Sequence, residues 1–576
     1  MAQENTPKRI FRALDNLSPS EIKLSQLPRK ANALYNLKFN EYGQLVKRRG
    51  YVKHNSQSLG DYPIAALHRS YRQGAEVREL LAVCNRNLYH IDDATGQAEL
   101  IAQLEADDAV FVDFYNTCYV LSGKLYKWNG TDFYTVGVTP PASAPTGSVQ
   151  SGGNLSTGKY LVAYTFVDKD GYESNPSPQA EFNVTSSDSK IILTIATSSD
   201  PKVVKRRIYR STADGGILYL DTEVDDNATT SVELTKSDLE LATGQILETN
   251  HDLPPDGAKL LARRRSRLYI AKDDALSISS LAEPEYFPLE LTFYTTARQR
   301  ITGLAEHGPA MCILTADTVE QLTGYSEDSF ALQSAYAPEG CIAPKSVVVA
   351  QGALIYLGVD GIYYFDGEVS RPLNAQLSEY LKANINPSYA HLSAATYFDN
   401  KYLLSYPKGE SNVPNETVYV DLKLGTTGIY SYAFSCFARL DKGADGLRLF
   451  AGDPKRGYIY RLEEATTDDG EQITAYDALE PFDFGVPDAY KQIYEVYVKV
   501  WAAGPSTLRL YYSLDYGEEK YIDAAVQQGW NWYRLRLPGG GQRCRAFGMR
   551  PTLTSSYDFI IAGYMIVFRV EVPEWS

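Results

Sequence analysis

Residues 88–92 read LYHID, and variants of this pentapeptide recur along the 576-residue chain. Each combines apolar and aromatic residues, usually before a turn-forming residue, which is typical of a strand that ends at a hairpin. The copies are LYHID at Leu88, LYKWN at Leu125, LYIAK at Leu268, a weaker VEQLT at Val319, IYYFD at Ile362, VYVDL at Val418 and IYRLE at Ile459. The first and second copies start 37 residues apart, the fourth and fifth 43, and the sixth and seventh 41. Because propeller blades are about 40–50 residues long, this spacing predicts an irregular β-propeller.

One interval between copies is too long for a blade. The 143 residues from Leu125 to Leu268 exceed one blade by roughly a hundred residues, the size of one β-sandwich. Pro- and Gly-rich segments flank the excess, VTPPASAPTGSVQSGGN at 138–154 and HDLPPDGAKL at 251–260. Between them, GKYLVAYTFVDKDGYESNPSP alternates like a strand before it turns. We therefore predict a fibronectin-like β-sandwich inserted at residues 145–250.

The pentapeptide stops near residue 475, and strict alternation with Gly-rich turns follows, as in WNWYRLRLPGGGQRC. This pattern predicts a separate C-terminal β-sandwich or jelly-roll domain at 476–576. An extended N-terminal arm at 1–60 and propeller segments at 61–144 and 251–475 complete the predicted, mainly β organisation. Helix is scarce, and RPLNAQLSEYLKANI is the best candidate for one.

Composition narrows the classes of function. The formal net charge of −15 argues against general nucleic-acid binding, which needs a basic stripe. The 44 tyrosines favour strands and interfaces. The apolar run FIIAGYMIVF at 559–568 is too short to cross a bilayer and is typical of a buried strand. The opening MAQENTPKRIFRALDNL lacks the apolar core of a secretory signal, so we expect a soluble protein made in the cytoplasm, without membrane contact.

Motifs that carry chemistry are missing from the sequence. The six cysteines and six histidines are scattered without C-x-x-C or H-E-x-x-H spacing, which predicts reduced core thiols, no metal and no cofactor. SLDYGEEKY at 513–521 approaches a sialidase turn and DKDGYES at 168–174 a calcium loop, but both lack further required residues and are expected to be plain turns. With no G-x-S-x-G, Walker or Rossmann pattern, we predict that the protein is not an enzyme.

Three runs of adjacent cations stand out in this acidic chain. They are Lys47-Arg48-Arg49, Lys205-Arg206-Arg207 and Arg263-Arg264-Arg265. A charge run is usually a solvated strand end. Adjacent cations on a strand point to both faces and repel one another, however, so an acidic partner is expected nearby, and another copy of the same protein is one option. The runs at 47–49 and 263–265 are our candidate assembly and docking residues; we predict no catalytic, cofactor-binding or metal-binding residues.

The segment LSPSEIKLSQLPRKANALYNLKFNEYGQLVKRRGY, residues 17–51, resembles the opening of the tail nozzle or tail hub proteins of short-tailed (podovirus-like) bacteriophages. The matching positions are a proline-containing stretch, Asn36, and the pattern G-x-L-x-K-R-x-G at Gly43, Leu45, Lys47, Arg48 and Gly50. The parts that follow also come in the order found in such proteins: first the predicted inserted sandwich with its RRIYRST segment, then SLAEPEYF at 280–287. The resemblance covers the arm, the insertion and the propeller, whereas the C-terminal domain matches only loosely.

The resemblance implies a structural virion protein of the phage tail, in a ring of identical subunits, usually a hexamer, below the portal adaptor. DNA passes through such a ring only in transit during ejection, past an acidic wall that repels phosphate, and tail fibres or tailspikes attach outside. It also implies that Lys47, Arg48 and Arg49 anchor the arm in the first blade or in a neighbouring subunit and do not read DNA.

Two other classes of function stay open. One is a glycan-binding or glycan-cleaving propeller protein of a tail, which a clustered carboxylate pair in an aromatic cleft would favour. The other is a distal tip or baseplate component of a long-tailed phage. Assembly state separates these classes, because a nozzle must form a closed ring on its adaptor.

Overall fold

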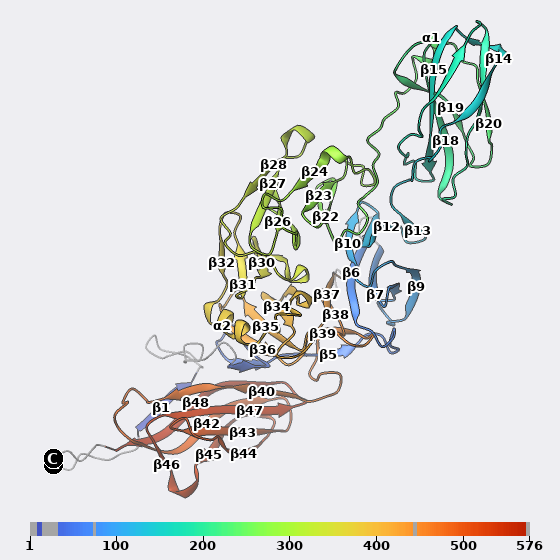
Figure 1. The fold of residues 1–576 in the computed structure, drawn as a ribbon. Helices are drawn as coiled ribbons and strands as arrows, with labels where there is room; N and C mark the ends of the chain where they lie inside the picture. The colour runs from blue at the N-terminus through green and yellow to red at the C-terminus, as the bar shows by residue number, and fades with distance from the viewer. Residues whose placement is uncertain (1–7, 14–32, 73–76, 442–445, 572–576) are drawn as a thin grey trace.

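The computed structural model describes residues 8–13, 33–72, 77–441 and 446–571. These residues form a propeller, a sandwich inserted into it and a C-terminal sandwich, so the predicted mainly β fold class is confirmed. Figure 1 shows the inserted sandwich and the C-terminal sandwich at opposite ends of the molecule, with the propeller between them.

Within the described residues, seven antiparallel four-stranded blades form the propeller; six are separate sheets, and the sixth is part of a ten-stranded sheet that continues into the C-terminal sandwich. Blade 1 contains β6 (Ile64–Arg72), β7 (Val77–Cys84), β8 (Asn87–Ile91) and β9 (Ala98–Gln103). Blade 2 contains β10 (Val110–Phe114), β11 (Thr117–Ser122), β12 (Lys124–Trp128) and β13 (Phe133–Thr135). Blade 3 contains β21 (Leu260–Arg264), β22 (Arg267–Lys272), β23 (Ala275–Ile278) and β24 (Thr292–Tyr294). Blade 4 contains β25 (Gly303–His307), β26 (Ala310–Leu314), β27 (Val319–Thr323) and β28 (Ala331–Ser334).

The remaining three blades complete the circle. Blade 5 contains β29 (Val348–Ala350), β30 (Ala353–Leu357), β31 (Ile362–Phe365) and β32 (Ser370–Pro372). Blade 6 contains β33 (Ala394–Phe398), β34 (Lys401–Tyr406), β35 (Glu416–Asp421) and β36 (Thr427–Tyr430). Blade 7 contains β37 (Cys436–Asp441), β38 (Leu447–Gly452), β39 (Ile459–Ala465) and, from the N-terminal arm, β5 (Gly50–Lys53).

The first strands of the blades form a closed ring. Each contacts the first strand of the next blade, from β6 through β10, β21, β25, β29 and β33 to β37, and β37 contacts β6 again. Six of the seven pentapeptides lie on the third strand of their blade, and LYIAK lies on the second strand, β22. Blade 3 departs from the pattern because its third strand reads ALSI and lacks a tyrosine.

The insertion is a two-sheet sandwich between blades 2 and 3. One sheet has the order β14 (Thr146–Leu155), β17 (Ser189–Thr194), β20 (Ser231–Leu234). The other has the order β16 (Ala180–Val184), β15 (Gly158–Asp168), β18 (Val203–Ser211), β19 (Leu218–Val224), and the short helix α1 (Asp238–Leu241) follows β20. Tyr160, Val162 and Ile191 lie in the core, and Val138, which precedes the first strand, packs into the same core.

Ion pairs from the buried Lys127 to Asp168, which is buried, and to Asp170, which is exposed, hold the insertion against the propeller. Nζ of Lys127 in blade 2 lies 2.6 Å from Oε1 of Glu285 and 2.7 Å from Oδ2 of Asp170. Asp170 belongs to the DKDGYES segment, in which Oδ1 of Asp168 accepts the backbone N–H groups of Asp170 and Tyr172. The segment is therefore a turn, as predicted, and it also attaches the insertion to Lys127.

The C-terminal sandwich has two sheets that enclose one hydrophobic core. The first sheet contains β1 (Lys8–Ala13), β3 (Leu37–Phe39), β4 (Leu45–Lys47), β42 (Lys491–Ala502), β45 (Gly529–Arg536), β46 (Gln542–Cys544) and β48 (Phe559–Val570). The second contains β2 (Leu34–Tyr35), β40 (Ile473–Asp477), β41 (Leu479–Phe482), β43 (Ser506–Leu514), β44 (Lys520–Val526) and β47 (Phe547–Ser555). The SLDYGEEKY segment forms the predicted hairpin turn between β43 and β44.

The arm predicted at 1–60 is woven into the other units. β2 pairs in parallel with β36 of blade 6 and antiparallel with β40 of the sandwich. β3 and β4 form a hairpin that joins β48, and β5 pairs with β39 of blade 7. The prediction that the arm enters the first blade is wrong, because the last blade has only three strands of its own and its edge accepts the fourth. Docking into a neighbouring subunit stays a prediction.

Helix is scarce, as predicted. The segment RPLNAQLSEYLKANI forms α2 (Ala375–Asn384), whose first turn is capped by Asn374 through a hydrogen bond from the Leu377 N–H. Short 3₁₀ turns occur at Leu289–Leu291, Glu327–Ser329, Pro344–Ser346, Ala390–Leu392 and Pro538–Gly540. Within the described parts of the chain, no helix combines the length and apolar character needed to cross a membrane.

Candidate functional site

Arg48 joins the arm to the propeller between β4 and β5. Its guanidinium donates to both carboxylate oxygens of Asp468, at 2.8 and 2.5 Å, and its Nε donates to Oδ1 of Asn36 at 2.7 Å. The ring of Tyr432 lies 4.6 Å from the guanidinium carbon. The Arg48 side chain is fully buried, so its charge is balanced inside the subunit.

The two cations beside Arg48 differ in environment. Lys47 is buried, and its Nζ donates to the carbonyl oxygens of Thr466 and Ser555, at 2.7 and 3.4 Å. Burial lowers the pKa of Lys47 to about 8. Arg49 is 46% exposed and lies 3.4 Å from Asp558. Of this run, therefore, Arg49 is the residue that presents its charge to solvent, and docking to a neighbouring copy through it stays a prediction.

The run at 205–207 lies on β18 of the insertion and alternates between the two faces of the sheet. Arg206 points inward, is fully buried and pairs with Asp226 at 3.0 Å. Arg207 points outward and bridges Glu173 and Glu223, at 2.7 Å each. The expectation of acidic partners is confirmed here, and these partners belong to the same chain.

The run at 263–265 lies at the turn between the first two strands of blade 3. Arg264 is buried and donates to the carbonyl oxygen of Gly324 at 2.8 Å. Arg263 donates to the carbonyl oxygen of Asp113 at 2.9 Å, and the Arg265 guanidinium lies 3.6 Å from the ring centre of Tyr325. Arg263 and Arg265 are exposed, so a docking role for this run stays a prediction that rests on these two residues.

A cavity of about 710 Å³ lies inside the ring of first strands and is lined by residues of all seven blades. This volume is within the range of small-molecule sites. The charged side chains on its wall are Asp108, Lys259, Arg300 and Lys345. Lys345 pairs with Asp108 at 2.9 Å, while Lys259 and Arg300 are exposed. The negative balance of the chain therefore does not extend to this cavity.

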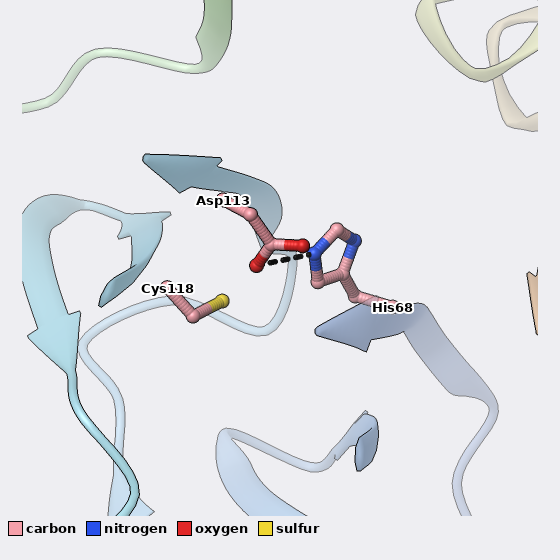
Figure 2. A group of neighbouring side chains, drawn as sticks. All are labelled: His68, Asp113 and Cys118. Carbon is pink, nitrogen blue, oxygen red and sulfur yellow. Dashed lines mark ion pairs between the residues drawn. The ribbon is translucent and has the colours of Figure 1, made fainter. Parts of the chain in front are cut away.

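A group of three potential ligands lies at the wall of this cavity. His68 on β6 lines the cavity, and its Nε2 is 3.2 Å from Oδ1 of Asp113 on β10. Cys118 on β11 is fully buried beside them, and one ligand atom from each of the three residues lies within 4.8 Å of the others. Figure 2 shows Asp113 between the imidazole and the thiol. The group thus joins blades 1 and 2.

Neighbouring groups set the charge and orientation of these side chains. Oδ1 of Asp113 accepts a hydrogen bond from the Ser70 hydroxyl at 2.9 Å, and Oδ2 accepts one from the Tyr71 N–H at 3.3 Å. Burial opposes ionisation of Asp113, but His68 and these donors hold the pKa of its carboxyl below the usual value. Burial and the nearby Asp113 charge raise the pKa of the Cys118 thiol well above its usual value.

This arrangement does not match a nucleophilic catalytic triad. In such triads the histidine lies between the nucleophile and the carboxylate, whereas here the carboxylate lies between the other two groups. A thiol with a raised pKa is also a poor source of the reactive thiolate. Imidazole, carboxylate and thiol side chains can instead bind a metal ion together, and this is the chemistry that the group supports.

The amino-acid sequence carries no signal for this group, because its members come from three strands in two blades. His68 is 45 residues before Asp113, and Cys118 follows a hairpin, so no ligand motif was visible. The predicted absence of a metal therefore stays a prediction. The prediction of reduced core thiols is confirmed, since all six cysteines are free and buried.

No protein-family model and no curated protein matches the chain. Among solved structures, it is similar to an exo-β-1,3-galactanase from Phanerochaete chrysosporium, with 9% identity over 83% of this chain and 98% of that one and a TM-score of 0.17. It is also similar to the Pan2 WD40 domain of Neurospora crassa, with 10% identity over 72% and 95% of the two chains and a TM-score of 0.25. TM-scores this low carry no conclusion about function, and the propeller assignment depends on the closed ring of blades.

Proposed function

We propose that the protein is a structural subunit of a bacteriophage tail, in the nozzle or hub. In this role it forms a ring, with six subunits as the expected number, below the portal adaptor. The ring surrounds the path of the DNA during ejection, and fibres or spikes attach to its outside.

The observation that carries the proposal is the position of the arm residues that resemble phage nozzle proteins. Asn36, Lys47, Arg48 and Gly50 all lie where blades 6 and 7 meet the C-terminal sandwich. Asn36 accepts from Arg48, donates to the Thr474 carbonyl at 2.8 Å, and has a positive φ of 53°. Because β2 and β5 join blades 6 and 7 to the sandwich, the arm stiffens the subunit, which suits a component of a ring.

The arrangement of the three β-units also supports an assembly role. The two sandwiches project from opposite ends of the propeller, where each can meet a neighbouring subunit (Figure 1). Arg49, Arg263 and Arg265 are exposed cations in an acidic chain and are suited to meet carboxylates of another copy. Pairs between these arginines and carboxylates of a neighbouring subunit have the chemistry expected at the rim of a subunit interface.

Assembly of the purified protein tests the proposal. We expect closed rings in negative-stain images and a matching mass by light scattering, either alone or with the adaptor protein of the same phage. Antibodies against the chain should label the tail of intact virions. A protein that stays monomeric with the adaptor at high concentration, and that is absent from virions, would contradict the proposal.

Glycan binding is the second candidate, and one observation favours it. Trp530 and Trp532 on β45 are 47% and 40% exposed, and Trp501 lies opposite Trp530 in the neighbouring strand β42. Aromatic faces exposed on a β-sandwich provide a platform on which sugar rings can stack. Replacing both Trp530 and Trp532 with alanine should abolish binding to host surface polysaccharide, and unchanged binding would exclude this role.

A further inference from the structure

We propose that His68, Asp113 and Cys118 form a binding site for one Zn²⁺ ion. This site lies in the wall of the propeller cavity and is independent of the proposed tail function. The inference depends on three side chains from adjacent blades, whose ligand atoms converge although they are far apart in sequence or separated by a turn.

The donor set selects the class of ion. Zn²⁺ accepts imidazole nitrogen, carboxylate oxygen and thiolate sulfur together, whereas Ca²⁺ and Mg²⁺ prefer oxygen ligands alone. Bond lengths around tetrahedral zinc place neighbouring ligand atoms about 3.3–3.6 Å apart. The 3.2 Å separation of His68 Nε2 and Asp113 Oδ1 is close to this value. The full group spans at most 4.8 Å, so side-chain adjustments of about an ångström complete the geometry.

Contacts around the ligands hold them in orientations that suit an ion. The His68 ring stacks on Phe111, with ring centres 5.2 Å apart and an interplanar angle of 2°. Asp113 is fixed by the buried Ser70 hydroxyl and the Tyr71 N–H. Such outer contacts orient metal ligands and increase affinity.

Binding requires one proton to leave the site. The Cys118 thiol gives its proton to solvent, and the resulting thiolate donates an electron pair to Zn²⁺; no bond to carbon changes and nothing is oxidised or reduced. With Asp113 ionised, the ion meets two negative charges and one neutral imidazole. Three protein ligands leave the fourth position of a tetrahedral ion for water or an anion, and His68 opens onto the cavity that supplies them.

Metal titration of the full-length protein tests this site. After chelator treatment and dialysis, we expect one Co²⁺ per chain, with the ligand-field bands of tetrahedral cobalt and a sulfur-to-cobalt charge-transfer band in the near ultraviolet. Zn²⁺ should displace Co²⁺ and raise the melting temperature. C118S should lose the charge-transfer band and weaken Zn²⁺ binding at least about tenfold.

Matched controls make the outcome decisive. Cys312, on β26 of blade 4, is equally buried, and His391 lines the same cavity outside the group. C312S and H391Q should bind like the unmodified protein. If C118S does not fold, H68Q decides, because its half-buried side chain should tolerate substitution and its loss should weaken Zn²⁺ binding while the sulfur band remains. Absence of stoichiometric binding, or equal binding by H68Q, overturns the proposal.

Discussion

Replacing Arg48 with methionine should open the junction between the arm and blade 7. The substitution keeps an unbranched apolar side chain but removes the guanidinium, and with it the charge that pairs with Asp468 and the donor to Asn36. Removing one partner of a buried ion pair costs about 3–5 kcal/mol. Because the Asp468 side chain is 16% exposed, water can partly solvate the remaining carboxylate, and we expect the lower end, about 3 kcal/mol.

Hydrogen exchange of the backbone measures this loss where it occurs. Unfolding of a chain with three β-units is not a single transition, whereas exchange reports the local opening of β5 and β39. A loss of about 3 kcal/mol should make their amides exchange about 100-fold faster, since 1.4 kcal/mol corresponds to a factor of ten. Arg49→Met is the matched control, because Arg49 is 46% exposed and its ion pair is expected to contribute less than about 1 kcal/mol.

The double variant Arg48→Met with Asp468→Asn tests the pairing itself. It should exchange more slowly than Arg48→Met alone, because the unpaired carboxylate is gone. The reasoning is refuted if Arg48→Met changes exchange of β5 less than about threefold, which is below 1 kcal/mol. Equal effects of the Arg48 and Arg49 substitutions would refute it as well.

Gly50→Ala should lower the melting temperature strongly, because a Cβ there would lie 1.9 Å from the Thr467 carbonyl oxygen, whereas Gly216→Ala, with open space around it, should change the melting temperature little. The pKa of Lys47 is lowered to about 8 from 10.5, so the unfolded chain binds more protons between these values, and stability should rise with pH there; in Lys47→Met the rise should be smaller in the same denaturation series. A fragment of residues 138–250 should fold alone and melt at a higher temperature than a fragment of residues 145–250, as followed by circular dichroism. Only the longer fragment contains Val138, which is buried in the core of the insertion.

Repeated local signals made the propeller predictable. A strand such as that starting at Ile362 has its own alternation and turn, and its distance of 43 residues from the previous copy is the length of one blade. The four-residue strand β5 has no such signal, since its pairing with β39 depends on contacts formed elsewhere in the chain. Arg48 and Arg49 are adjacent and chemically alike in the sequence, and only the packing of Tyr432 and Asp468 buries one of them.

The same limit applies to the group in the cavity wall. His68, Asp113 and Cys118 meet because blades 1 and 2 lie side by side, and the spacing of ligands along the chain does not encode that neighbourhood. The 143-residue interval, in contrast, did reveal the insertion, because a gap in the regular spacing of the pentapeptides can be seen in the sequence alone. Its attachment through Lys127 was not visible, since the ion partners belong to different units.

The arm strand in blade 7 also sets the order in which the chain can mature. Lys53 pairs with Tyr460, so the last blade cannot be completed until the ribosome has added 407 further residues. At about 5–20 residues per second, residues 50–53 wait roughly 20–80 s for their partner strand. During synthesis the nascent chain therefore carries an open ring with an unpaired edge, which chaperones can bind. Closure waits for blade 7 to be made, and a chain that terminates before β39 carries the arm strand without its partner.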